Sequence, residues 1–206
     1  MQNPKEVFNY HASHYTTDIM DIKLYEGAID CFCNEIKNPK ARILDLGCGP
    51  GNVTEHLLKR HSQYRVCGLD IAENMLALAQ MRNSRASFAL MNATDIAQLS
   101  QKFDGIVVSF LLPYLSKNKV EKLIADCSKL IMDNGMIYLC TMEGDYEQSG
   151  PVLSSSGKSS LVNYYYDQDY LEKTLASNGF ALRHIKRVQA PNTDVVDLIL
   201  IASKNN

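Results

Sequence analysis

Short apolar runs alternate with helical stripes along most of this chain. Ala41 to Leu46 is a compact apolar run closed by a glycine cluster, and Val53, Leu57 and Leu58 follow at helical spacing. This pattern predicts a buried strand and then an amphipathic helix, and it repeats down the chain. The other strands expected from it are Arg65 to Leu69, Ala86 to Leu90, Phe103 to Phe110 and Met136 to Thr141.

The strand expected at Phe103 to Phe110 indicates how the sheet is covered. Ile106 to Val108 is an unbroken apolar run, which is typical of a parallel strand with helices on both faces. Ser116 can cap the next helix, and a turn is expected at Asp133 to Gly135. The apolar stripe of that helix comprises Val120, Leu123, Ile124, Cys127, Leu130 and Ile131.

The beginning of the chain and a later segment depart from this alternation. Residues 1–38 are expected to form a helical cover, because Leu24, Ala28 and Ile29 recur at helical spacing. Residues 143–166 open with a stretch rich in Ser and Gly that lacks periodicity, which predicts a lid-like insertion.

A helix from Asp167 to Asn178, ended by Gly179, precedes two final strands, Ala181 to Val188 and Val195 to Ser203. The link between these strands is too short for a parallel crossover, so they should be antiparallel. We therefore expect one domain, residues 1–206, with a doubly wound α/β fold. Its seven-stranded, mostly parallel sheet would end in a C-terminal antiparallel hairpin. Such sheets bind ligands beyond the carboxyl ends of their strands.

Composition and charge exclude several classes of function. The 206 residues carry 21 Lys and Arg against 23 Asp and Glu, which argues against a nucleic-acid partner or an anionic membrane surface. Residues Met1 to His11 hold no signal-peptide core, and the most apolar stretch, Gly105 to Leu115, is about half of a membrane span. We expect a cytoplasmic protein, a monomer or homodimer, without a membrane partner.

The cysteines agree with that compartment. Six are present and no Cys-x-x-Cys pair occurs. The Cys-x-Cys at Cys31 and Cys33 has no second pair to complete a zinc site. We therefore expect free, mostly buried thiols and no metal.

A glycine-rich loop, Asp45 to Asn52, follows the first expected strand. Glycines at alternate positions let the backbone approach a ligand and adopt positive φ, and the next helix presents free N–H groups. Asp45 can place a carboxylate where it suits an amino group. Taken alone, the loop could equally be a tight turn with a capping aspartate. The candidate binding residues of this loop are Asp45, Gly47, Cys48, Gly49 and Gly51.

Polar residues also close the next two strands. Asp70 ends the second strand about twenty residues after the last loop glycine, where a carboxylate accepts hydrogen bonds from both hydroxyls of a ribose. Asn92 and Ala93 follow the third strand, where the Asn amide can accept from a purine amino group and the Ala N–H can donate to a ring nitrogen. Each residue alone is more typical of packing or capping, but their placement at successive strand ends indicates a nucleoside site.

With these motifs the sequence resembles the class I S-adenosylmethionine-dependent methyltransferases, especially their small-molecule branch, over nearly the whole chain. That resemblance implies a Rossmann-like fold, S-adenosylmethionine as cofactor and methyl transfer to a small-molecule acceptor. The in-line displacement would be driven mainly by positioning and exclusion of water. The residues that carry the resemblance are the Asp-x-Gly-x-Gly-x-Gly run from Asp45, Asp70, Phe103-Asp104, Gly179-Phe180 and the opening Phe8-Asn9-x-x-Ala12-x-x-Tyr15.

The resemblance also implies cofactor contacts and shows two departures. Gly47, Gly49 and Gly51 would line the amino-acid part, with Asp45 near its ammonium. Many relatives have Asp where Asn92 stands, and often a His pair where this chain has Pro113-Tyr114. The remaining implied contacts are Asp70 at the ribose, Ile71 and Met75 beside the adenine, Asn92 and Ala93 at its edge, and Phe110 near the methionine portion.

Catalytic residues are harder to assign from the sequence. A carboxylate or amine acceptor needs little help, whereas a hydroxyl acceptor needs a base. The weak candidates are Tyr15, His11 and His14, for which surface or packing roles are the alternative. The aromatic residues expected to cover the sulfonium by cation–π attraction are Tyr10, Tyr15, Tyr164, Tyr165 and Tyr166.

Three other functions remain open at this point. An NAD(P)-dependent oxidoreductase would carry Gly-x-Gly-x-x-Gly, whose third glycine falls where Asn52 stands. A non-catalytic S-adenosylmethionine-binding protein could share the same fold. An RNA or protein methyltransferase is disfavoured because the sequence lacks a basic face.

Overall fold

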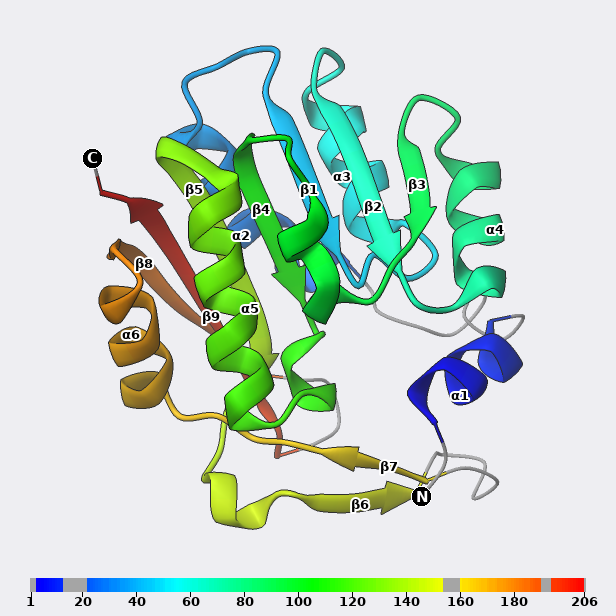
Figure 1. Ribbon diagram of the computed structural model, residues 1–206, viewed down its shortest axis with the longest axis vertical. Coiled ribbons are helices and arrows are strands. Elements are labelled where there is room, and N and C mark those ends of the chain that lie inside the picture. Colours follow the sequence, from blue (N-terminus) through cyan, green and yellow to red (C-terminus); the bar gives the residue numbers. More distant parts are fainter. Residues whose placement is uncertain (1–2, 13–21, 154–159, 190–193, 206) are drawn as a thin grey trace.

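One seven-stranded sheet forms the centre of the molecule, of which the computed structural model describes residues 3–12, 22–153, 160–189 and 194–205. Its strands are β1 (Arg42–Leu46), β2 (Arg65–Asp70), β3 (Ser87–Leu90), β4 (Phe103–Ser109), β5 (Ile131–Met142), β8 (Phe180–Gln189) and β9 (Val196–Lys204). The strand order is β3-β2-β1-β4-β5-β9-β8 (Figure 1). Strands β1 to β5 are parallel, and β9 is antiparallel to both of its neighbours. The expected doubly wound sheet with a C-terminal antiparallel hairpin is confirmed.

Helices cover both faces of this sheet (Figure 1). On one face, Ile43 and Val107 belong to a core shared with α2 and α3, while on the other Leu44 and Val108 belong to a core shared with α5 and α6. Both faces of β4 are therefore buried, as its unbroken apolar run predicts. The helices are α2 (Lys23–Glu35), α3 (Asn52–Arg60), α4 (Glu73–Arg82) beside β2 and β3, α5 (Lys117–Leu130) and α6 (Gln168–Ser177).

Three short elements lie near the carboxyl ends of the strands: α1 (Pro4–His11), η1 (Ala93–Gln98) and η2 (Leu112–Tyr114). Helix α1 packs on α4, where the backbone N–H of Asn74 donates to Oδ1 of Asn9 over 2.9 Å. The side-chain amide of Asn74 also donates to the carbonyl of Asn9 over 3.0 Å, and the two hydrogen bonds fix α1 at this edge of the sheet.

The segment expected to be an irregular lid contains regular structure. After η3 (Tyr146–Gln148), β6 (Gly150–Leu153) pairs antiparallel with β7 (Ser160–Asn163) in a separate two-stranded sheet. Ser, Gly and Pro weaken the local strand signal here, and the pairing that forms the strands is with residues farther along the chain. The sequence pattern therefore misses this hairpin.

The structure adds detail to three further expectations. Residues 1–38 form two helices, α1 and α2, and the residues between them lie outside the described chain. Strand β5 starts at Ile131 and includes the expected turn, where Asn134 has φ 61° and the pairing with β4 shifts. Ser116 occupies the N-cap of α5, but its side chain makes no capping hydrogen bond.

The described residues bear on three further expectations. All six cysteines are free thiols. No group of three His, Cys, Asp or Glu side chains in the described residues is arranged to hold a metal ion. Within the same residues, the helices are too short or too polar to cross a membrane.

Candidate functional site

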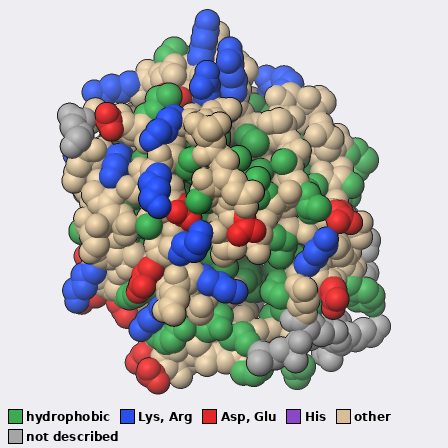
Figure 2. Space-filling model, in the orientation of Figure 1, with side chains coloured by type: hydrophobic (Ala, Val, Ile, Leu, Met, Phe, Trp, Pro, Cys, Tyr) green, Lys and Arg blue, Asp and Glu red, His purple; other side chains and the backbone are tan. Residues whose placement is uncertain are grey.

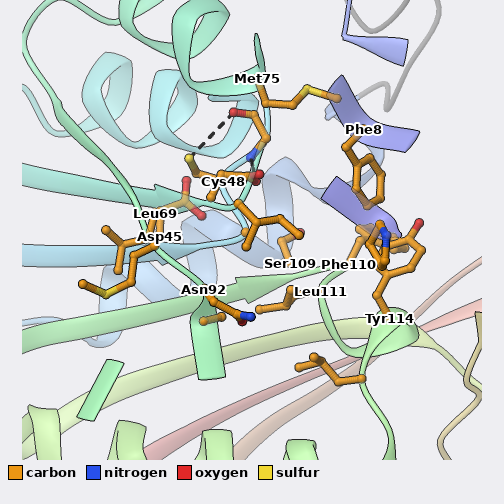
Figure 3. A pocket seen from close by; sticks show the side chains of 18 of the residues that line it. Phe8, Asp45, Cys48, Leu69, Met75, Asn92, Ser109, Phe110, Leu111 and Tyr114 are labelled. Atoms are coloured by element: carbon orange, nitrogen blue, oxygen red, sulfur yellow. Dashed lines mark hydrogen bonds between the residues drawn. The ribbon is translucent and has the colours of Figure 1, made fainter. Parts of the chain in front are cut away.

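A pocket of about 470 Å³ opens at the carboxyl ends of the first four strands, between the sheet and α1. In the space-filling view, hydrophobic side chains gather on the part of the surface that contains this opening, and Lys and Arg spread over α5 (Figure 2). The volume is in the range of small-molecule sites. The sequence-predicted binding residues that line the pocket are Asp45, Gly47, Cys48, Gly49, Asp70, Ile71, Met75, Asn92, Ala93 and Phe110 (Figure 3).

Gly51 lies behind the pocket wall. It is the N-cap of α3 with φ 83°, and a Cβ there would stand 2.5 Å from the side-chain nitrogen of Asn83. That nitrogen donates to the carbonyls of Gly51 and Ala79, each over 3.2 Å. Gly51 therefore lets α4 approach the glycine-rich loop closely, although it does not itself line the pocket.

The three candidates for a catalytic base cannot be placed by the structure. Tyr15 and His14 lie outside the described residues. His11 is the last residue of α1, but its side chain is outside the description. Their roles remain predictions from the sequence.

Asp45 places a buried carboxyl group at the end of β1. Its side chain is 1% exposed, and Oδ2 accepts a 2.7 Å hydrogen bond from the hydroxyl of Thr54. Burial raises the pKa of Asp45 to about 6, the Thr54 hydrogen bond opposes this rise, and the nearby Asp70 adds to it. A cation placed against this carboxyl group would stabilise its ionised form.

Asp70 ties the glycine loop to the end of β2. Oδ2 accepts from the backbone N–H of Gly49 over 2.9 Å, and Oδ1 accepts from the N–H of Ala72 over 2.8 Å. Burial raises the pKa of Asp70, and these backbone hydrogen bonds oppose the rise. Because each carboxylate oxygen has two lone pairs, both oxygens can still accept from a ligand in the pocket.

Asn92 also makes the capping contact that is the alternative role of such a residue. Its Oδ1 accepts a 3.0 Å hydrogen bond from the N–H of Thr94 and thereby caps η1. The amide oxygen keeps one lone pair for a ligand. The cap fixes the side chain at the pocket wall, beside Ala93.

Two aromatic residues without a sequence-assigned role also line the pocket. Phe8 of α1 and Tyr114 of η2 meet edge to face, with ring centroids 5.0 Å apart and planes at 82° (Figure 3). In the sequence, Phe8 belongs to the opening motif and Tyr114 stands where many relatives have a His pair. Their contact joins distant parts of the chain, so periodicity within one segment could not indicate it.

Phe110 is held by a buried polar pair. Phe110 has φ 54°, unusual for a bulky residue, and its ring meets the ring of Tyr25 at 5.3 Å and 81°. The hydroxyl of Tyr25 donates to Oδ2 of Asp197 over 2.6 Å. Burial raises the pKa of both groups. The pair anchors α2 to β9 and fixes the wall behind Phe110.

None of the four described tyrosines that are expected to cover a sulfonium lines the pocket. Tyr10 is 60% exposed on α1, and Tyr15 is outside the described residues. Tyr164 stacks on Tyr146 at 5.7 Å, and the buried Tyr166 donates to the carbonyl of Leu115. Neither Tyr164, Tyr165 nor Tyr166 lines the described pocket.

Comparison with protein families and known proteins gives a consistent result. Residues 43–135 match the family described as "Methyltransferase domain". Over 75 residues the chain is 41% identical to a trans-aconitate 2-methyltransferase of Variovorax paradoxus, a match that covers 36% of this chain and 29% of that protein. It is 29% identical to a malonyl-[acyl-carrier protein] O-methyltransferase of Bacillus anthracis, over 80% of this chain and 60% of that protein.

These matches are partial, whereas the match to solved structures is nearly complete. The chain spans from 22% to 60% of the length of the first curated relatives that it matches. The structure of magnesium protoporphyrin IX methyltransferase from Synechocystis with bound SAH is similar at a TM-score of 0.74 and 17% identity. That match covers 98% of each chain.

Proposed function

We propose that this chain, which has the fold of class I methyltransferases and matches a methyltransferase family over residues 43–135, is an S-adenosylmethionine-dependent methyltransferase of a small molecule. The observation that carries this proposal is the convergence of Asp45, Asp70 and Asn92 on one pocket at the strand ends. The curated relatives named above act on trans-aconitate and on malonyl-[acyl-carrier protein]. The match of residues 43–135 to a methyltransferase family and the carboxyl groups of the pocket are the reasons to expect S-adenosylmethionine here.

Each polar group would hold one part of the cofactor. Asp70 would accept from the two ribose hydroxyls, Asn92 and Ala93 would meet the adenine edge, and Asp45 would attract the ammonium. The bound cofactor supplies an electrophilic methyl group on a positively charged sulfur. The chain contributes by binding, orienting the acceptor and excluding water, which can supply roughly 7–11 kcal/mol of the barrier reduction.

Titration calorimetry tests this function directly. S-adenosylmethionine and its demethylated form, S-adenosylhomocysteine, should bind to the protein, whereas NADH should not. Saturable binding of NADH without binding of S-adenosylmethionine would favour the oxidoreductase alternative. Cofactor binding without turnover of any acceptor in a broad panel would favour the non-catalytic alternative.

The pH dependence of cofactor affinity should report on Asp45. The pKa of Asp45 is about 6 in the free protein, and an ammonium beside the carboxylate would lower it in the complex. Affinity should therefore be full above about pH 7 and fall as the pH drops through about 6, by at most about tenfold per pH unit. Calorimetry between about pH 5 and pH 7.5 measures this.

The Asp45→Asn variant is the control for that pH profile. It keeps a hydrogen-bond acceptor for Thr54 but removes the titrating group. Its affinity for the cofactor should be lower at neutral pH and nearly flat over the same range. A wild-type profile that is equally flat would contradict the placement of the ammonium.

A further inference from the structure

One end of the pocket is aromatic. Phe8, Phe110 and Tyr114 come from three different elements, and we call them the aromatic end. Phe8 and Tyr114 touch edge to face, and Phe110 is fixed from behind by Tyr25. In the close view Phe8 and Tyr114 lie together on one side of the pocket, away from the carboxylate of Asp45 (Figure 3).

The charged residues of the described pocket wall lie away from the aromatic end. Asp45 and Asp70 belong to the glycine-loop side. Lys119 lies one turn before Lys122 on α5, and the ammonium of Lys122 donates to the carbonyl of Thr94. Lys119 therefore shares the face of α5 that packs on η1, where the adenine is expected. Apart from Lys119, the described lining residues include no Lys, Arg or His that could pair with an anion at the aromatic end.

These charges and rings select against an anionic acceptor. A carboxylate that entered the aromatic end would lose water without gaining a cationic partner from the described wall. The nearby carboxylates of Asp45 and Asp70 would also repel it. A flat, uncharged ring would lose little hydration and could stack on, or meet edge-on, the aromatic side chains.

We propose that the aromatic end binds a neutral, planar acceptor, a phenol or an uncharged nitrogen heterocycle, and this rests on the proposed methyltransferase function. In the transfer, a lone pair of the acceptor oxygen or nitrogen forms a bond to the methyl carbon as the carbon–sulfur bond breaks. The bonding pair returns to sulfur, which becomes a neutral thioether, and the proton of the acceptor passes to a water molecule, which acts as the base. Phe8, Phe110 and Tyr114 set the plane of the acceptor ring and do not exchange protons.

A matched pair of probes tests the charge preference. The protein is first saturated with S-adenosylhomocysteine, and 2-naphthol or 2-naphthoate is then titrated into the complex and followed by calorimetry. The two probes share one ring system and differ in charge at neutral pH. We expect 2-naphthol to bind at least about tenfold more tightly. Equal or tighter binding of 2-naphthoate, or no binding of either probe, would overturn the inference.

The saturation step separates this inference from the proposed function. If S-adenosylhomocysteine does not bind, the methyltransferase proposal itself fails. If it binds and the naphthol preference is missing, only the acceptor class is wrong.

Variants at Tyr114 test whether the aromatic end is the binding surface. Tyr114→Leu should weaken 2-naphthol binding by about two- to tenfold, and Tyr114→Phe should keep it within about twofold, because the ring remains. Tyr10→Leu, on the exposed side of the same α1 that carries Phe8, should leave it unchanged. Loss of binding in Tyr114→Phe but not in Tyr114→Leu would contradict a ring contact.

Discussion

Replacing Asp70 with alanine should weaken S-adenosylmethionine binding by about 1.5–3 kcal/mol, or roughly 10- to 150-fold. Two ribose hydroxyls would lose a charged acceptor. The variant also removes the acceptors of the backbone N–H groups of Gly49 and Ala72, so the glycine loop loses its tie to β2. Calorimetric titration of the folded variant measures the loss.

Asp133→Ala is the matched control for Asp70→Ala. Asp133 is exposed near the amino end of β5, and its substitution changes the net charge by the same amount. Its cofactor affinity should equal that of the wild type. The cofactor affinity of Asp70→Asn should lie between those of the wild type and Asp70→Ala, because the amide keeps an oxygen acceptor but loses the charge. Wild-type affinity in a folded Asp70→Ala protein would rule out Asp70 as the ribose ligand.

The second large effect is on stability, at Gly51. An alanine at this position would have to adopt the left-handed backbone conformation, which costs about 1–2 kcal/mol. Its Cβ would also stand 2.5 Å from the side-chain nitrogen of Asn83. Overpacking of this kind adds about 1–3 kcal/mol. We therefore expect Gly51→Ala to lower the free energy of unfolding by about 2–5 kcal/mol and Tm by roughly 4–20 °C.

The Gly49→Ala variant separates the cost of the left-handed backbone from the cost of overpacking. Gly49 also has positive φ, 52°, but a Cβ there would meet nothing within 4 Å. This variant should lose only the backbone part, about 1–2 kcal/mol. Thermal melts without cofactor compare the two variants. Equal losses of stability in the two variants would show that the contact with Asn83 adds no cost at position 51.

The sheet could be predicted because its signals are local. Each parallel strand is an apolar run of a few residues followed by a turn, and the carboxyl ends of such strands share one edge. For that reason Asp45, Asp70 and Asn92 could be placed at the same pocket from spacing alone. The fold class and the pocket wall from the strand ends follow from this reasoning.

Contacts between distant segments leave no local pattern in the sequence from which they could be predicted. Tyr25 and Asp197 are 172 residues apart, and no pattern within either segment indicates their hydrogen bond. The same holds for the meeting of Phe8 with Tyr114. The tyrosines at 164–166 seemed suited to a ligand because they are aromatic and clustered, but Tyr166 satisfies its hydroxyl on Leu115. Aromatic clustering alone does not distinguish packing from binding.

The position of β9 fixes the order in which the sheet can be assembled. Within the described sheet, β8 pairs with β9 alone, and β9 also covers the edge of β5. A growing polypeptide that has not yet reached Val196 therefore leaves β5 as an open edge and β8 without a neighbour. Such an apolar edge can pair with another chain. Interrupted synthesis before this strand would yield an aggregation-prone fragment, although every residue of the glycine loop is already present.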